Sequence, residues 1–230
     1  MKKSTTLFIL VFSASVLLAQ SSETRSLGTF HGVSASASVD VELRQGNVNE
    51  AEITVKNIDI DKIRTEVKNG ILRVGVNGKS NWNWAKKRTM KVVVTYAGEL
   101  DYLAASSSAD LICHNVIRAD KLKVEASSSA DVYLEVDVEH IAASASSSGD
   151  IEVSGTANSA NLKSSSSGDI LGFKLEASDV VAQASSSGDV EITATQKLKA
   201  RASSSGDVTY RGNPQNKDVS SSSGGDISPD

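Results

Sequence analysis

The chain has 230 residues, of which 39 % are hydrophobic and 23 % charged, so it is long and apolar enough to fold around a core. Its formal charge of −4 argues against nucleic-acid binding through overall charge. One cysteine and three histidines exclude a disulfide framework, a zinc ribbon and a cysteine–histidine cluster.

Residues 1–19 are typical of a secretory signal peptide. Lys2 and Lys3 precede an apolar run from Leu7 to Leu18, and Ala19 supplies a small residue at the expected cleavage site. A membrane anchor is the alternative, but it needs about 20 apolar residues and this run is shorter. No later segment is apolar enough to cross a bilayer. We therefore expect a chain without a membrane span that is exported to the periplasm, to the outer-membrane surface or to the medium.

Residues 20–105 are predicted to form an N-terminal β region that caps the rest of the fold and is continuous with it. Alternating apolar and polar residues predict strands at 33–43, 51–56, 63–68, 71–76 and 90–96. Asn69-Gly70 lies between two of these runs. Since this dipeptide favours the positive φ values of a tight turn, we expect an antiparallel hairpin there.

A second feature of this region is a short segment that holds both tryptophans of the chain. Trp82 and Trp84 stand beside Lys86, Lys87 and Arg88. Indole rings stack on sugars, and bases attract acidic groups, so these five residues are the candidate ligand-binding residues. The alternative is a solvated loop with one indole folded onto the protein.

Residues 106–230 contain a repeat of the string Ser-Ser-Ser-(Ala/Gly)-Asp, with a weaker copy far upstream that ends at Asp40. The successive copies end at Asp110, Asp131, Asp150, Asp169, Asp189, Asp207 and Asp226, the last of them with an extra glycine. The intervals lie between 18 and 21 residues, and such a period without a helical pattern is typical of a solenoid with one coil per repeat. We therefore predict an all-β fold, a parallel β-helix or β-solenoid with about 19–21 residues per coil.

Positions at odd distances from each repeat aspartate are mostly small or apolar, which is the period of a strand. We expect this alternation to continue through the serine string, so that outward serines form a flat ladder of hydroxyls beside a column of aspartates. A flexible Ser/Gly linker is the competing interpretation, but linkers carry no apolar pairs at a fixed parity. A β-sandwich is the structural rival.

The aspartate column is the second candidate site. Neighbouring carboxylates repel one another, and calcium could relieve this repulsion; otherwise each aspartate accepts backbone or serine hydrogen bonds at a turn. We expect no cofactor and no catalytic residue, because His31, His114 and His140 lie far apart and the aspartates are repeated identically. The lone Cys113 is expected to be a buried small hydrophobe.

The C-terminal coil has no predicted cover. Such an end would expose apolar side chains and unpaired backbone groups. Either it is frayed, or a second subunit covers it in a homo-oligomer.

Three segments resemble the opening and the repeats of a known bacterial family. They are Phe30 with Val33-Ser34 and Val39-Asp40-Val41-Glu42-Leu43, then the run from Thr65 to Val74, and the Ser-Ser-Gly-Asp copies. The chain resembles the putative auto-transporter adhesin head GIN domain family over nearly all of its length after residue 19. The resemblance implies a β-helix-like fold and an exported envelope protein. We expect a non-catalytic module that binds a glycan or protein ligand at the cell surface. The alternative is a polysaccharide-acting β-helix enzyme.

Overall fold

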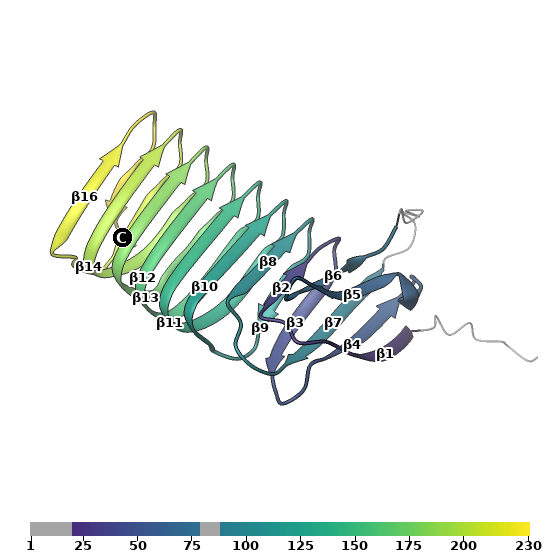
Figure 1. The fold of residues 1–230 in the computed structure, drawn as a ribbon. Helices are drawn as coiled ribbons and strands as arrows, with labels where there is room; N and C mark the ends of the chain where they lie inside the picture. The colour runs from purple at the N-terminus through teal and green to yellow at the C-terminus, as the bar shows by residue number, and fades with distance from the viewer. Residues whose placement is uncertain (1–19, 79–87) are drawn as a thin grey trace, which may run out of the picture.

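The structure, a computed structural model, describes residues 20–78 and 88–230. It is a β-solenoid, in which flattened coils stack along one axis, with antiparallel strands at the N-terminal end (Figure 1). The predicted fold class is therefore confirmed. The predicted signal peptide and four residues of the candidate ligand-binding segment, Trp82, Trp84, Lys86 and Lys87, lie outside the described residues.

The N-terminal part contains seven strands and one short helical turn. These are β1 (Gln20–Ser26), β2 (Gly32–Ala35), β3 (Asp40–Gln45), β4 (Glu50–Lys56), the 3-10 turn η1 (Ile60–Lys62), β5 (Ile63–Lys68), β6 (Ile71–Val76) and β7 (Thr89–Tyr96). The regular coils follow as β8 (Tyr102–Ser106), β9 (Asp110–Cys113), β10 (Ile117–Ser127), β11 (Asp131–Ser146), β12 (Asp150–Ser165), β13 (Ile170–Ser185), β14 (Val190–Ser203), β15 (Val208–Arg211), β16 (Asn216–Ser221) and β17 (Ile227–Pro229).

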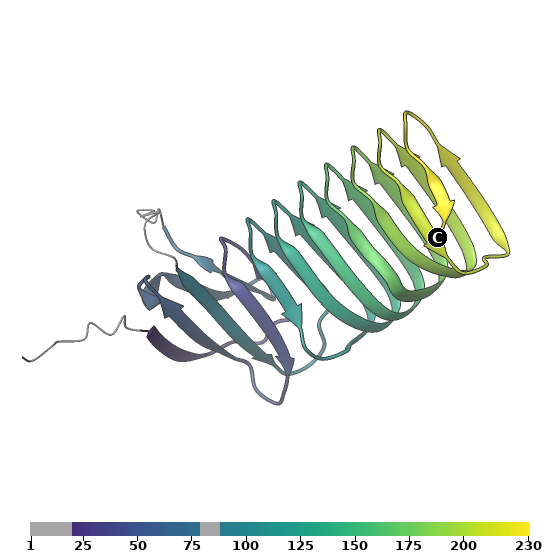
Figure 2. The ribbon, with the colours of Figure 1, turned by 180° about the vertical axis from the view of Figure 1, so that it is seen from behind.

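Each regular coil contributes to two parallel sheets that face one another. The aspartate sheet comprises β9, the first halves of β11 to β14, β15 and β17, all of which follow a repeat turn. The lysine sheet comprises β8, the second halves of β10 to β14, and β16, all of which lead into the next repeat turn. The serine turns form one edge of the solenoid, and the rounded bends within the long strands form the other (Figures 1 and 2).

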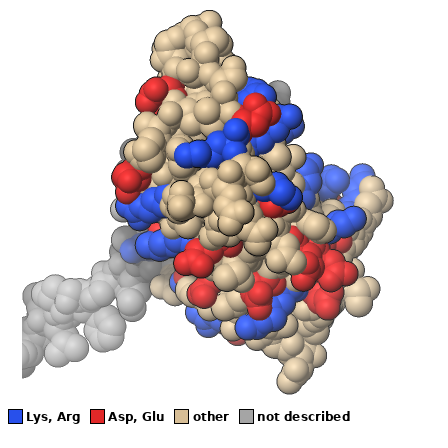
Figure 3. Space-filling view, turned by 90° about the vertical axis from the view of Figure 1, so that its left-hand side faces the viewer, with Lys and Arg blue, Asp and Glu red and all other residues tan. Residues whose placement is uncertain are grey.

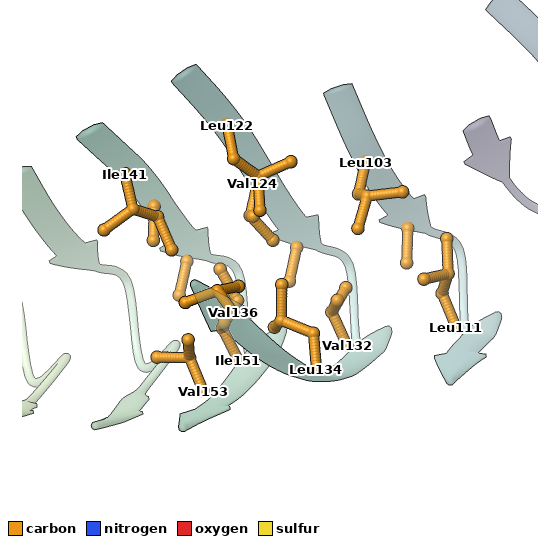
Figure 4. Close-up of a cluster of buried hydrophobic side chains, with 14 of the residues drawn as sticks. Leu103, Leu111, Leu122, Val124, Val132, Leu134, Val136, Ile141, Ile151 and Val153 are labelled. Carbon is orange, nitrogen blue, oxygen red and sulfur yellow. The ribbon is translucent and has the colours of Figure 1, made fainter. Parts of the chain in front are cut away.

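The core lies between the two sheets. Inward side chains from both sheets meet there and are almost completely excluded from water (Figure 4). Leu122, Val124 and Ile141 come from the lysine sheet, and Val132, Leu134 and Ile151 come from the aspartate sheet. Since consecutive inward residues are two positions apart, the alternation that predicted strands also supplies this core.

The serine strings interrupt the alternation, contrary to the prediction that it continues through them. The second and third serines of each string, such as Ser147 and Ser148, have φ values of 51° and 58° and are exposed. Gly149 N–H donates to the carbonyl of Ser146 at 3.0 Å, which closes a tight turn with two left-handed residues. The serines therefore form a corner where the chain passes between sheets, rather than a flat ladder of hydroxyls.

The residue before each repeat aspartate packs against the backbone of the preceding coil. A Cβ atom added to Gly168 would lie 2.6 Å from Ser146 N and 2.7 Å from Gly149 O. In the copies of the repeat that carry glycine before the aspartate, neighbouring coils therefore stack too closely at that glycine to leave room for a side chain.

The weak upstream copy forms the same turn and belongs to the same stack. Ala37 and Ser38 have φ values of 62° and 56°, and Ser38 N–H donates to Ser107 O at 3.0 Å. β2 and β3, on either side of that turn, pair in parallel with β8 and β9. The strand before β2 and the strands between β3 and β8 add the antiparallel pairs β1–β4, β4–β7 and β5–β6. The predicted Asn69-Gly70 hairpin is confirmed, because Lys68 pairs with Ile71 across it.

The C-terminal coil is the last of the stack (Figure 2), and β16 is exposed along its whole length. Lys217 pairs with the buried Leu198 in register, and so occupies an inward column. Its Nζ lies 5.9 Å from the ring centroid of Tyr210 on the opposite sheet. Pro229, which lacks an N–H, pairs with Tyr210 in the edge strand. A charged residue in an inward position and an edge proline both discourage another strand from adding to a sheet.

We expect this coil to resist end-to-end association. Replacing the inward charge and the edge proline together (Lys217→Leu with Pro229→Val) should create an apolar, hydrogen-bonding end that pairs with other copies. Analytical ultracentrifugation should find a monomeric wild type and a self-associating variant. Lys199→Leu on the outer surface is the control and should remain monomeric. A wild type that associates as strongly as the double variant would contradict this interpretation.

Candidate binding surfaces

The repeat aspartates stand in one file along the edge of the aspartate sheet. Asp110, Asp131 and Asp150 pair directly in register, and the residues that follow the later aspartates pair in the same way. Asp40 of the weak copy extends the file at its N-terminal end, because Val41 pairs with Leu111. The column is thus a property of the coil register.

Backbone N–H groups donate hydrogen bonds to many of these carboxylates. The N–H of Asp189 donates to Asp169 Oδ1 at 2.9 Å, and the N–H of Asp207 donates to Asp189 Oδ1 at 2.8 Å. The same bond links Asp169 to Asp150 and Asp226 to Asp207. Where the preceding repeat has alanine in place of glycine, the aspartate N–H donates instead to the carbonyl of that alanine. Asp150, for example, donates to Ala130 O at 3.0 Å. The glycine copies therefore use the aspartate as a structural acceptor.

The N-terminal end of the column differs electrostatically. Burial raises the pKa of Asp40, an effect that Lys91 partly offsets, and burial together with the charge of Asp40 raises the pKa of Asp110. Within residues 20–78 and 88–230, no group of three or more His, Cys, Asp or Glu side chains is arranged to hold a metal ion. Calcium binding along the column stays a hypothesis.

The hydrogen-bond ladder predicts unequal roles for two aspartates of the same column. Asp169→Ala should lower the free energy of unfolding by about 1–2 kcal/mol, because the Asp189 N–H loses a charged acceptor. Asp131→Ala is the matched control, since its carboxylate accepts no hydrogen bond from the described chain, and should change stability by less than about 0.5 kcal/mol. Urea unfolding measures both. Equal losses in the two variants would contradict a ladder role.

The outer surface of the aspartate sheet is strongly acidic. Its outward carboxylates are Asp110, Asp131, Glu135, Asp150, Glu152, Asp169, Asp189, Glu191, Asp207, Asp226 and Asp230, against the cations Lys174 and Arg211. Tyr133 and Leu171, 39 % and 42 % exposed, lie among them. Burial raises the pKa of the Tyr133 hydroxyl, and the charges of Asp131, Asp110, Glu152 and Asp150 add to this effect. Seen from the C-terminal end, side chains of both charges are scattered over the body of the solenoid, whereas its apex carries none (Figure 3).

Glu42 in β3 is the centre of a cluster of bases. Its carboxylate lies 2.5 Å from Lys91 Nζ, 3.1 Å from Arg44 and 3.1 Å from His114 Nε2, while its side chain is only 16 % exposed. The hydrogen bond from Lys91 is the largest cause that holds the pKa of Glu42 below its usual value, and that from His114 acts in the same direction. Cys113 beside it is half-buried, and burial raises the pKa of its thiol to about 12, which makes it a poor nucleophile.

This cluster predicts a pH dependence. Because the folded pKa of Glu42 lies below the unfolded value of 4.5, its stabilisation is present above pH 4.5 and is lost as pH falls through the folded pKa. Glu42→Gln should lower stability at pH 7 by about 1–2 kcal/mol and reduce the further loss of stability below pH 4.5. The control is Glu135→Gln, an exposed position with no ion pair inside the described chain. Parallel pH profiles for Glu42→Gln and wild type would refute the assignment.

The rounded bends enclose a polar groove that the sequence analysis did not identify. It has a volume of about 610 Å³ and lies between Glu99, Arg118, Asp120, Asp137, Glu139, Thr156, Asn158, Glu176, Ser178 and Thr195. Thr156 Oγ1 donates to Asp137 Oδ1 at 3.2 Å, Arg118 Nε lies 3.4 Å from Asp137 Oδ2, and Asn158 donates to Glu139. We call this hollow the bend groove.

Of the predicted ligand-binding segment, only Arg88 belongs to the described residues, where it directly precedes β7. The prediction for Trp82, Trp84, Lys86 and Lys87 therefore stays a prediction.

The bend groove was missed because its residues come from bends of different coils. The one sequence signal for this groove was the pair of acids, Asp137 and Glu139, on either side of the apolar Val138. In the described part of the chain, no helix could cross a membrane.

Residues 29–214 match the family model described as putative auto-transporter adhesin, head GIN domain. The comparison with curated proteins gives no match. Among solved structures, a putative adhesin from Bacteroides fragilis is similar with a TM-score of 0.83 at 22 % identity, over 92 % of this chain and 97 % of that one. A putative adhesin from Parabacteroides merdae has a TM-score of 0.70 at 20 % identity, over 92 % and 96 %. A protein from Parabacteroides distasonis, named a putative lipid binding protein, has a TM-score of 0.67 at 20 % identity, also over 92 % and 96 %.

The structural similarities at these identities establish a shared fold. The family model reaches further, since it spans both the antiparallel N-terminal strands and the regular coils. This chain belongs to the family of putative auto-transporter adhesin head GIN domains.

Proposed function

We propose that this protein is an exported, non-catalytic binding module that attaches to a glycan or protein ligand at the cell surface or in the periplasm. The single observation that carries the proposal is the regular spacing of its outward side-chain positions from coil to coil. Register places side chains of the same column in equivalent positions from coil to coil, as in the file of aspartates. Such a surface suits a repetitive ligand held by many weak contacts rather than one reacting group.

The environment of the aspartates supports a structural and binding role. A glycosidase needs two carboxyl groups held in different environments, so that one is an acid and the other a base or nucleophile. In the glycine copies, each aspartate instead accepts the N–H of the next, in the same geometry four times. Membership of a family described as adhesins agrees with this role.

Export is supported by the first residues of the chain. The basic start, the apolar run and Ala19 make up the pattern of a cleavable secretory signal. The described strands begin at Gln20, directly after this segment. A protein directed to the periplasm, to the outer-membrane surface or to the medium would meet the ligands that this proposal requires.

The second candidate is a polysaccharide-acting enzyme, which the bend groove favours because it brings carboxylates and an arginine together. Two facts argue against it. The side chain of Asp137 is 60 % exposed, which gives it little of the burial that makes a carboxyl a good general acid at neutral pH. Both Asp137 and Glu139 also bond to neighbouring surface side chains.

The test uses the chain expressed with its own first residues in an exporting bacterial host. We expect periplasmic protein whose sequence starts at Gln20, binding on a glycan array, and no release of reducing ends from polysaccharides. A Trp82→Ala/Trp84→Ala variant tests the predicted ligand-binding segment and should bind more weakly. Cleavage that Asp137→Asn abolishes would replace this proposal with the enzyme, and retention in the cytoplasm with Met1 intact would refute export.

A further inference from the structure

The lysine sheet carries cations on its outer surface, opposite to the acidic surface of the aspartate sheet. Its outward cations are Lys121, Lys123, Lys163, Lys197, Lys199 and Arg201. All of them stand at even distances from a repeat aspartate, which are the outward positions of these strands. In a chain with a formal charge of −4, this surface is therefore an exception.

These cations occur on every second strand. Lys121 and Lys123 belong to β10, Lys163 to β12, and the remaining three to β14. On the strands between them no lysine or arginine stands in these columns: β11 places His140, Ala142 and Ser144 there, and β13 places Asp179, Val181 and Gln183. Because adjacent strands are about 4.8 Å apart, the cationic rows repeat about every 10 Å along the solenoid axis.

The acids on this sheet neutralise only part of the positive charge. Glu125 pairs with Lys123 at 2.8 Å, Asp179 with Lys197 at 2.9 Å, and Asp218 with Arg201 at 2.9 Å. Lys121 and Lys163 form no ion pair within the described chain and are exposed. Since the opposite sheet is strongly acidic, an anionic polymer would be repelled from that side and drawn to this one.

The C-terminal end of the same sheet is hollowed. A depression of about 510 Å³ has Val181 and Leu198 among its walls, and its charged lining consists of Lys197, Lys199 and Lys217 with the carboxylates of Asp179 and Asp218. Apolar side chains next to ammonium groups suit a sugar ring that carries an acidic substituent, because the ring offers C–H groups and the substituent a negative charge.

From these observations we infer that the lysine sheet binds an acidic polysaccharide that lies along the solenoid axis and carries one carboxylate or sulfate on every second sugar. In an extended β-linked chain, each sugar advances by nearly one strand spacing, so a disaccharide spans the distance of about 10 Å between cationic rows. An anionic membrane surface would not need this period. Among exposed large hydrophobic side chains of the described chain, only Val219 belongs to this sheet, in the last coil, so the sheet has little to insert into a bilayer.

This inference rests on the proposed binding function and makes it specific. The test measures affinity by biolayer interferometry for three immobilised polymers, namely hyaluronan with a carboxylate on every second sugar, polygalacturonate with one on every sugar, and neutral dextran. Vesicles of phosphatidylglycerol form a fourth arm. The variant is Lys121→Glu/Lys163→Glu/Lys199→Glu, and the control with the same change of net charge is Lys56→Glu/Lys62→Glu/Lys174→Glu.

We expect hyaluronan to bind best and dextran not at all, with at least a tenfold loss of affinity in the lysine-sheet variant and less than a threefold loss in the control. Equal losses in the two variants, or binding to vesicles alone, would overturn the inference. Binding of neutral or protein ligands with no preference for acidic polymers would overturn it and leave the proposed function standing. Cleavage of the polymers would instead remove the proposed function.

Discussion

The fold depends on one local constraint, the turn in which two consecutive serines adopt left-handed backbone conformations. For a residue with a side chain, each such conformation costs about 1 kcal/mol or more, so a pair in every coil needs compensation. The compensation comes from stacking. The third serine N–H of one coil donates to a carbonyl of the next turn, as Ser148 does to Ser166 at 3.1 Å, and the following alanine or glycine is buried against the preceding coil.

This constraint fixes the phase of every coil and thereby the surfaces. A turn at the same place in each repeat puts the following valine or isoleucine in the core and the aspartate at the sheet edge. The same phase sends the residues six, eight and ten positions before the aspartate to the outer side of the other sheet, where the cations lie. The acidic and basic surfaces of the solenoid thus both follow from the same repeat length. A substitution at one outward position of the repeat can therefore change one surface without disturbing the core.

Periodicity predicted much of the fold, because coil length, strand parity and the Asn69-Gly70 hairpin are local properties of the sequence. It failed at the serine strings, where Ser147 and Ser148 have no intrinsic preference for left-handed geometry and adopt it only because neighbouring coils hold them there. It also could not show that Asp40 and Asp110 are neighbours, since the 56 residues 46–101, which contain β4 to β7 and their connections, separate their coils in sequence. The bend groove and the Glu42 cluster depend on such long-range placement too.

The central claim is that successive coils stack with their serine turns aligned. Distances between equivalent turns test this claim most directly. Spin labels at position 107 paired with labels at 186, 204 or 223 span four, five or six coils. Double electron–electron resonance should give narrow distributions centred near about 19, 24 and 29 Å, since each coil adds about 4.8 Å. Broad distributions, or distances that do not rise in equal steps, would contradict the stacked solenoid.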